Sequence, residues 1–151
     1  MRSGIEIEMR NLSIYNKSPI KKDTIHKLIS LLSHDLSFKV KNLEISFVDS
    51  TKIKEVNRDF LRHNYSTDII TFNYSFEKNI IDGEIIISLT DLKNNSIRYK
   101  TALKQETIRV IIHGLLHLLG YDDIEKTKRR RMKLKENFYV KKYTDLLNTQ
   151  G

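Results

Sequence analysis

One segment of the chain would be apolar around nearly its whole circumference if it formed a helix. It runs from Glu106 to Leu119, and its aliphatic side chains are Ile108, Val110, Ile111, Ile112, Leu115, Leu116, Leu118 and Leu119. A helix with apolar residues on every face must be enclosed by other elements, so we expect it to be central and buried. Gly120 follows, and glycine readily adopts the left-handed conformation that ends a helix. We therefore expect a fold organised around this helix, with a chain reversal directly after it.

The rest of the chain alternates between strand-like and helix-like patterns. Alternating or continuous apolar runs predict strands at Ile5–Met9, Leu43–Asp49, Asp68–Tyr74 and Glu84–Leu89. Helical spacing predicts helices from Ser18-Pro19 to Leu32, over Thr51–Leu61, from Thr90 onward with a break before the apolar helix, and over Ile124–Leu147. A turn at Asp82-Gly83 would make the last two strands an antiparallel pair. These patterns predict an α+β fold, with one small mixed sheet of about four strands covered by about five helices.

The organisation of the chain favours a single domain over residues 1–151. Its 151 residues include one proline, five glycines and no Ser/Gly-rich linker that would mark a boundary. The longest central run without a charged residue, Val110–Tyr121, is shorter than the ~20 residues that cross a bilayer, so no membrane association is expected. The N-terminal segment lacks an apolar signal sequence and cysteine is absent, which favours the cytoplasm. A formal net charge of +8 favours a polyanionic partner such as nucleic acid.

Two histidines stand in the apolar helix at metal-binding spacing. His113 and His117 are one helical turn apart, so their imidazoles can reach the same ion. A turn at Gly120 would bring Asp123 back toward them, and three protein ligands with one open position are typical of a catalytic zinc site. The alternative is a pair of core histidines bonded to the backbone, with Asp122 or Asp123 capping the next helix.

The residue after the first histidine bears on the reaction class. Zinc peptidases of the H-E-x-x-H type carry their general base, a glutamate, at that place, whereas this chain has Gly114. The sequence therefore argues against a minimal zinc peptidase.

The segment HGLLHLLGYDD, from His113 to Asp123, resembles the signature H-G-x-L-H-L-x-G-Y-D-H of the bacterial YbeY family, and only the last place differs. GEIIIS, from Gly83 to Ser88, is similar to a strand of that family. The upstream segment VNRDFLRHNYSTDIITF is also similar to a family segment, through Asn57, Thr67, Asp68 and Phe72. YbeY proteins are metal-dependent endoribonucleases linked to ribosomal RNA maturation. The resemblance covers roughly residues 43–139.

The resemblance implies a function and a set of site residues. It implies a single-strand-specific endoribonuclease that acts in ribosomal RNA maturation and ribosome quality control, with the small ribosomal subunit and the GTPase Era as partners. One zinc ion would be held by His113, His117 and Asp123, with Asp123 standing where the family has histidine. The family's catalytic arginine falls on Leu61, and the neighbouring Arg62 is the candidate to replace it. The alternative is a ribosome-assembly protein that binds RNA, with a structural metal and no turnover.

Two further features complete the predicted site. Asp68 is a candidate hydrogen-bond acceptor for a ligand histidine, although it equally well begins a strand. Basic residues that follow the histidine motif are candidates to hold an RNA backbone, namely Lys126, Lys128, Arg129, Arg130 and Arg131. The alternative for this run is a solvated helix face with no partner.

Overall fold

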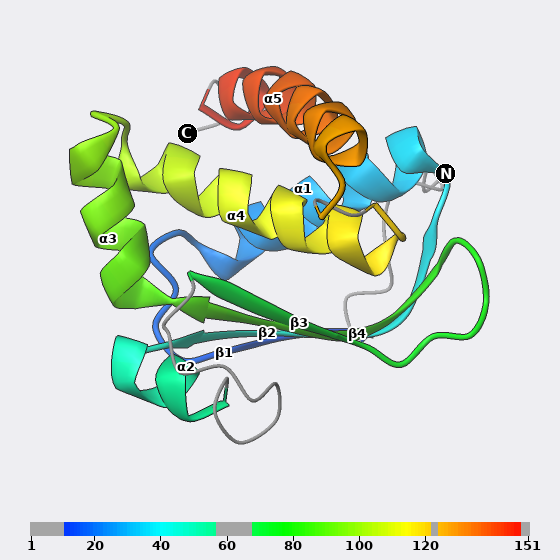
Figure 1. Cartoon of the computed structure of the whole chain (residues 1–151), viewed down its shortest axis with the longest axis horizontal. Helices are drawn as coiled ribbons and strands as arrows, with labels where there is room; N and C mark the ends of the chain where they lie inside the picture. The colour runs from blue at the N-terminus through cyan, green and yellow to red at the C-terminus, as the bar shows by residue number, and fades with distance from the viewer. Residues whose placement is uncertain (1–10, 57–67, 122–123, 149–151) are drawn as a thin grey trace.

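The structure is a computed structural model that describes residues 11–56, 68–121 and 124–148. Within these residues it contains four strands and five helices (Figure 1). The strands are β1 (Leu12–Tyr15), β2 (Lys39–Val48), β3 (Ile69–Asn73) and β4 (Ile80–Ser88). The helices are α1 (Lys22–Leu36), α2 (Ser50–Val56), α3 (Leu89–Arg98), α4 (Leu103–Leu118) and α5 (Lys126–Asn148). The predicted α+β class, with a small mixed sheet and helices around it, is confirmed.

The four strands form one mixed sheet in the order β1-β2-β4-β3. β1 pairs with β2 and β2 with β4 in parallel, whereas β3 runs antiparallel to β4. One row of paired residues crosses the whole sheet through Ile14, Ile45, Ile85 and Thr71. Because side chains alternate between the two faces of a strand, this register places the isoleucines of the three parallel strands on one face. That face supports the main core.

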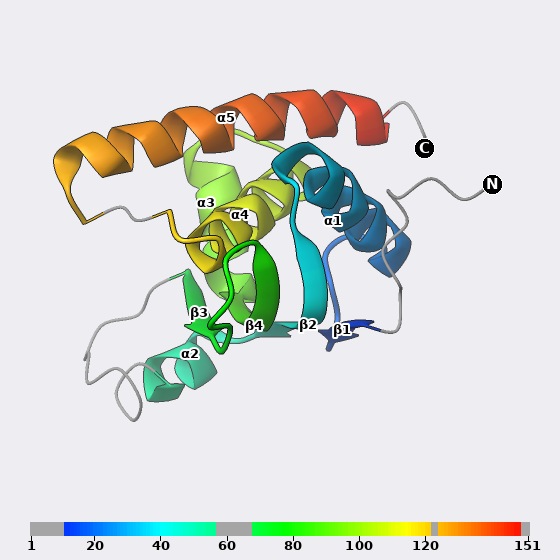
Figure 2. The ribbon, with the colours of Figure 1, turned by 90° about the vertical axis from the view of Figure 1, so that its right-hand side faces the viewer.

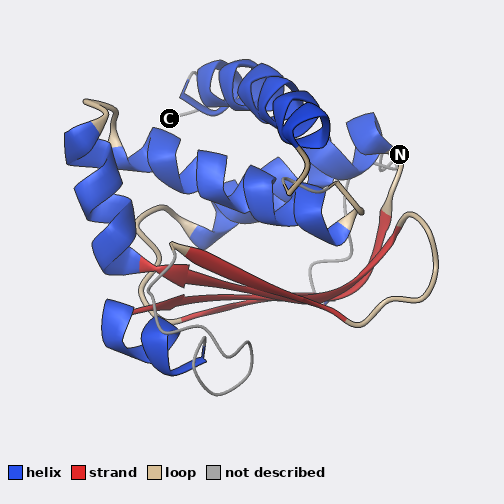
Figure 3. Ribbon diagram, viewed as in Figure 1, coloured by secondary structure: helices blue, strands red, loops and turns tan. Residues whose placement is uncertain are grey.

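The helices are layered on the sheet (Figures 2 and 3). Figure 2 shows α1 and α4 lying over one face of the sheet, with α5 crossing above them and α2 on the opposite side. Figure 3 shows the same separation of helices from strands. Lys142 on α5 bonds to Asp35 on α1 at 2.6 Å, and Tyr143 donates to the same carboxylate. These hydrogen bonds link α5 to α1.

The central position predicted for the apolar helix is confirmed. α4 lies between the sheet and α5, and its residues Ile108, Ile111 and Ile112 are fully buried. It ends in a Schellman motif: the Tyr121 N–H donates to the Leu116 carbonyl and the Gly120 N–H to the His117 carbonyl, both at 3.0 Å. Gly120 has a φ of 99°, a conformation that glycine adopts at little cost. The predicted chain reversal therefore begins at this residue.

Several predicted boundaries were wrong. α1 begins at Lys22 because the Ser18 hydroxyl accepts from the Ile20 N–H at 3.1 Å, which makes a local turn in place of a helix cap. β1 at Leu12–Tyr15 was not predicted, and the strand predicted at Ile5–Met9 lies outside the described residues. The antiparallel pairing of β3 and β4 is confirmed.

The turn predicted at Asp82-Gly83 was also wrong, because both residues lie inside β4. A Cβ atom built on Gly83 would lie 2.3 Å from the Phe72 carbonyl oxygen of the neighbouring β3. The glycine therefore marks a place where two backbones approach closely, a second common reason for glycine in a strand. The connection between the strands instead contains Asn79, which has a φ of 63°.

Candidate metal centre

His113 and His117 are brought together by the regular geometry of α4. Their Nε2 atoms lie 3.1 Å apart, and their ring centroids are separated by 4.7 Å. Both side chains remain partly exposed on a helix whose other residues are mostly buried. The predicted convergence of the two imidazoles is therefore present in the structure.

The separation of the two nitrogens fits a shared cation. Two imidazole nitrogens bound to one tetrahedral zinc ion at about 2.0–2.1 Å would lie roughly 3.3 Å apart. The observed 3.1 Å is within a few tenths of an ångström of that spacing. Without a cation, the same distance suits a hydrogen bond in which one ring donates and the other accepts. The pair thus needs little movement to accept a metal ion.

A carboxylate orients the first of these rings. Glu136 on α5 lies with its Oε1 atom 2.5 Å from Nδ1 of His113. When Nδ1 carries the proton and donates to this carboxylate, the lone pair of Nε2 points toward His117. Metal-binding histidines commonly have such a partner, because it selects the tautomer and makes the ring a better ligand. Sequence reasoning missed Glu136, since no spacing rule connects residues 23 positions apart.

Glu136 is itself held by positive charge. Its side chain is 4% exposed, and its Oε2 atom accepts from Arg109 at 2.6 Å and from Lys133 at 3.2 Å. Burial alone would raise the pKa of this carboxyl group. The hydrogen bond from His113, together with the charges of His113 and Lys133 and the bond from Arg109, outweighs burial and lowers the pKa of Glu136 to about 2. The acceptor therefore stays ionised at neutral pH.

The imidazole of His113 opens into a cavity of about 570 Å³ between α3, α4 and α5. Its wall also carries Lys133 and Arg129 from α5 and Asp68, which directly precedes β3. Burial raises the pKa of Asp68, while the charge of His113 opposes that rise. Asp68 is thus placed beside the ligand candidate, and its predicted role as an acceptor for a ligand histidine stays a prediction.

The glycine between the two histidines is packed against the sheet. A Cβ on Gly114 would lie 2.9 Å from Cδ1 of Ile69 and 3.0 Å from Cδ1 of Ile85. A side chain as large as glutamate at this position would have to displace the core. The structure therefore supports the argument against an H-E-x-x-H peptidase.

Other predicted site residues lie outside the described residues, namely Asp123, Arg62 and Leu61. Within the ranges 11–56, 68–121 and 124–148, no three His, Cys, Asp or Glu side chains are grouped so that they could hold a metal ion. Asp123 as the third ligand and Arg62 as a catalytic residue therefore stay predictions.

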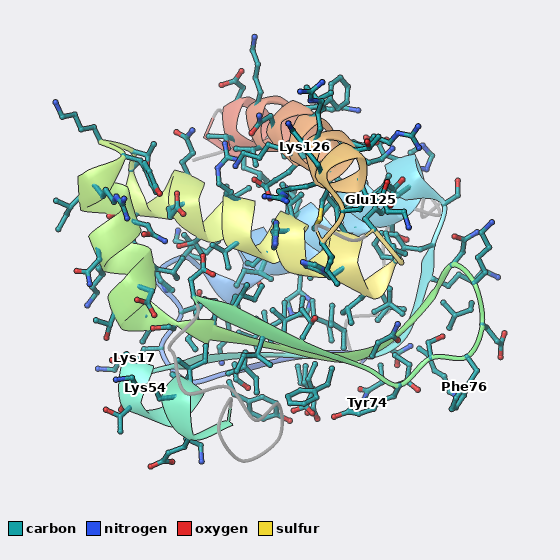
Figure 4. All side chains as sticks on the ribbon, in the orientation of Figure 1. Lys17, Lys54, Tyr74, Phe76, Glu125 and Lys126 are labelled. Carbon is teal, nitrogen blue, oxygen red and sulfur yellow. The ribbon has the colours of Figure 1, made fainter. Side chains whose placement is uncertain are left out.

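The basic run forms the first turns of α5 and continues into the cavity wall. Lys126, Lys128, Arg129, Arg130 and Arg131 are all exposed. Figure 4 shows Glu125 and Lys126 where α5 begins. Arg129 lines the cavity. Arg131 lies two residues further on, which turns its side chain by about 200° around the helix axis. The basic residues therefore point in different directions, and Arg129 is the one of the five that lines the cavity.

Comparison with known proteins identifies the family. A family model described as "Endoribonuclease YbeY" matches residues 6–144 of the chain. The chain belongs to the YbeY family. A relative named Endoribonuclease YbeY from Chlorobium limicola is 35% identical over 139 residues, which cover 91% of this chain and 96% of the relative. One of the same name from Karelsulcia muelleri is 42% identical over 101 residues, covering 67% of this chain and 71% of the relative.

A solved structure supports the fold. The solution structure of a Thermotoga maritima protein superposes on this YbeY-family chain with a TM-score of 0.66 and 23% sequence identity. The match covers 92% of this chain and 93% of that protein. Among the described residues, no helix is both long and apolar enough to span a membrane.

Replacing Glu136 by glutamine should weaken metal binding by this YbeY-family site about 10- to 100-fold, the range found when a partner of a metal-binding histidine is lost. The amide keeps the shape of the side chain but has no charge with which to hold the imidazole proton. Zinc affinity measured by competition with a chelating dye checks this prediction. Glu77→Gln is the matched control, because Glu77 is exposed in the loop before β4. Equal affinities for the two variants would contradict the role assigned to Glu136.

Proposed function

We propose that this chain is a metal-dependent endoribonuclease that cuts single-stranded RNA. This activity is the one in the names of the chain's relatives. Two of these relatives differ from the chain at about three aligned residues in five. The observation that carries the proposal is the pair of Nε2 atoms 3.1 Å apart, one of them on a ring oriented by a buried carboxylate. His113 opens into a cavity that carries Arg109, Arg129 and Lys133 together with Asp68, Glu106 and Glu136, and its cations can stabilise a phosphodiester during cleavage.

The proposed metal is one zinc ion held by His113, His117 and Asp123. When bound, zinc supplies positive charge that stabilises negative charge on a phosphate oxygen and makes a coordinated water more acidic. Glu136 keeps the proton of His113 on Nδ1, so that Nε2 remains available as a ligand. Arg109 and Lys133 in turn keep Glu136 ionised. These contacts thus hold His113 in the tautomer and orientation that can bind the metal before substrate arrives.

The cavity suits a single strand of RNA. Arg129 and Lys133 line the same cavity as His113 and can contact phosphates of a bound strand. A flexible single strand can present a phosphate inside a recess, whereas recognition of a duplex relies on contacts across its regular outer surface. The net charge of +8 would also attract RNA over longer distances.

The biological setting is proposed from the family resemblance. We place the cleavage in ribosomal RNA maturation and ribosome quality control in the cytoplasm, with the small ribosomal subunit and the GTPase Era as partners. Sequencing of ribosomal RNA ends in cells that lack this protein tests the setting, and unprocessed ends are expected.

The deciding experiment pairs metal analysis with an RNA-cleavage assay. Protein purified without an affinity tag should contain about one zinc ion per chain. It should cut a short single-stranded RNA, lose that activity in a chelator and regain it when zinc is added back. RNA binding without any turnover in the zinc-loaded protein would contradict the enzyme and favour a ribosome-assembly protein with a structural metal.

A pair of charge reversals tests how α5 holds RNA. Arg129→Glu should weaken binding of single-stranded RNA and lower the slope of log affinity against log salt by about 0.7, the value for one lost phosphate contact. Arg131→Glu is the matched control, because it makes the same charge change on another side of the helix. Fluorescence anisotropy across a salt series measures both slopes. Identical slopes for the two variants would show that only the overall charge matters.

A further inference from the structure

The end of the cavity at the α3–α4 junction differs in chemistry from the end that carries His113. It is lined by Asn95 and Tyr99 of the α3 region and by Thr101 in the connection to α4. Figure 1 shows this junction at the start of α4, whereas the histidines lie further along that helix. These three side chains are uncharged, whereas Lys133 bonds to the same Glu136 carboxylate as His113. A histidine pair with a nearby cation, next to an aromatic and polar region, matches the two parts of a nucleotide, its phosphate and its base.

Tyr99 offers a stacking surface. Its side chain is 59% exposed although it lines the cavity, so much of the ring remains accessible. The guanidinium of Arg98 lies 5.5 Å from the ring centroid, an attraction that restrains the ring. Exposed aromatic rings beside a cationic groove are the usual platforms on which the bases of single-stranded nucleic acids stack.

Two polar side chains near the ring can contact the edge of a base. The Asn95 amide is partly buried in the cavity wall and can both donate and accept hydrogen bonds. Glu106 is 5% exposed and lines the same cavity from α4. Its carboxyl oxygens can accept from an exocyclic amino group, which adenine, cytosine and guanine carry and uracil lacks.

The spacing along α4 places these groups beyond the cleaved bond. Glu106 and His113 are seven residues apart and lie on the same face of the helix, about 10 Å from each other along its axis. A base at Glu106 therefore belongs to a neighbouring nucleotide and not to the phosphate at the metal.

We infer that the α3–α4 end of the cavity is a subsite for the base of a nucleotide flanking the cleaved bond, with Tyr99 stacking on the base and Asn95 and Glu106 contacting its edge. This inference rests on the proposed function for RNA as the substrate. It adds a specificity: the flanking base is preferably one with an exocyclic amino group.

The test combines a protein variant with a change in the RNA. Binding of a short single-stranded oligoribonucleotide is measured by fluorescence anisotropy in the presence of a chelator, and each nucleotide in turn is replaced by an abasic one. In the parent protein, one abasic position should weaken binding on the order of tenfold, as the loss of one stacked base does. In Tyr99→Ala the same abasic change should have almost no further effect, because the two changes remove the same contact.

Two further variants serve as controls. Tyr99→Phe keeps the ring and should behave like the parent. Ile97→Ala, a change on the same helix at a side chain that is 76% exposed, should leave both affinity and abasic profile unchanged. Replacing the base at the sensitive position by uracil should weaken binding more than replacing it by cytosine.

The outcomes separate this inference from the proposed function. If the parent cuts RNA but the effects of Tyr99→Ala and of the abasic nucleotide simply add at every position, the subsite is refuted and the enzyme assignment stands. If base-dependent coupling appears but zinc-loaded parent cuts no RNA, the base-binding role of Tyr99 stands, and the enzyme assignment fails together with the placement beside a cleaved bond. A parent that binds no oligoribonucleotide would refute both.

Discussion

The His117→Ala variant should lose its bound zinc and its RNA-cleaving activity together. A zinc site can contribute about 10 kcal/mol of binding free energy, and removing one protein ligand forfeits a large part of it. We expect zinc to fall from about one ion per chain to a small fraction of that, and cleavage to fall at least about 100-fold, since the chemistry depends on the metal. Zinc content by mass spectrometry and initial cleavage rates at matched protein concentration measure the two effects.

His117 is a better choice for this test than His113. Its replacement leaves the bonds between His113, Glu136 and Arg109 intact, so a change in folding is less of a concern. His34→Ala is the matched control, because that histidine is exposed near the end of α1. Circular dichroism should show the same helix content for both variants and the parent. Retention of full zinc and full activity by His117→Ala would show that this side chain is not a ligand.

The Gly83→Ala variant should be much less stable than the parent, although the substitution adds only one methyl group. That group would lie 2.3 Å from the Phe72 carbonyl oxygen, and a backbone atom of a paired strand cannot rotate away. Either the β3–β4 pairing must separate or the strand must distort. We expect the free energy of unfolding to fall by about 3 kcal/mol, the upper part of the usual range for overpacking. Urea denaturation followed by circular dichroism measures the change.

Gly114→Ala is the matched control for this prediction. Its new methyl would meet the Cδ1 atoms of Ile69 and Ile85 at 2.9 and 3.0 Å, and these side-chain ends can move more easily than a backbone carbonyl. Alanine is also favoured over glycine inside a helix by about 1 kcal/mol, which offsets part of the crowding. We therefore expect a change of no more than about 1 kcal/mol at this site. A smaller loss for Gly83→Ala than for Gly114→Ala would contradict the strand-crowding argument.

Gly83 and Gly120 show what sequence patterns can and cannot predict. Asp82-Gly83 has the composition of a hairpin turn, which is why its sequence predicts one. The structure places it within β4, because the residue faces a carbonyl group of β3 across the sheet. Gly120 was assigned correctly as a helix end, since the apolar pattern stopping at Leu119 supplied independent support. A glycine therefore predicts a turn or a helix end reliably when the pattern of the flanking residues favours one of these roles over the others.

Features that depend on neighbours in the chain could be predicted from the residues alone. The all-round apolar pattern of 106–119 identified the central helix, and the four-residue spacing of His113 and His117 identified the candidate metal pair, because 3.6 residues per turn place both rings on one face. The strand patterns also predicted the α+β class, and the short connection expected between the last two strands predicted the antiparallel pairing of β3 with β4.

The groups that surround that pair depend on how the helices pack, and the sequence patterns did not predict them. Glu136 reaches His113 because α5 packs across α4, and Arg129 enters the cavity wall for the same reason. Tyr99 and Asn95 complete the cavity because α3 adjoins the start of α4. Such contacts join residues whose separation along the chain follows no helical or strand period, and they depend on how whole helices pack. The sequence therefore determined the two candidate ligands, and helix packing determined the acceptor, the charge and the substrate cavity around them.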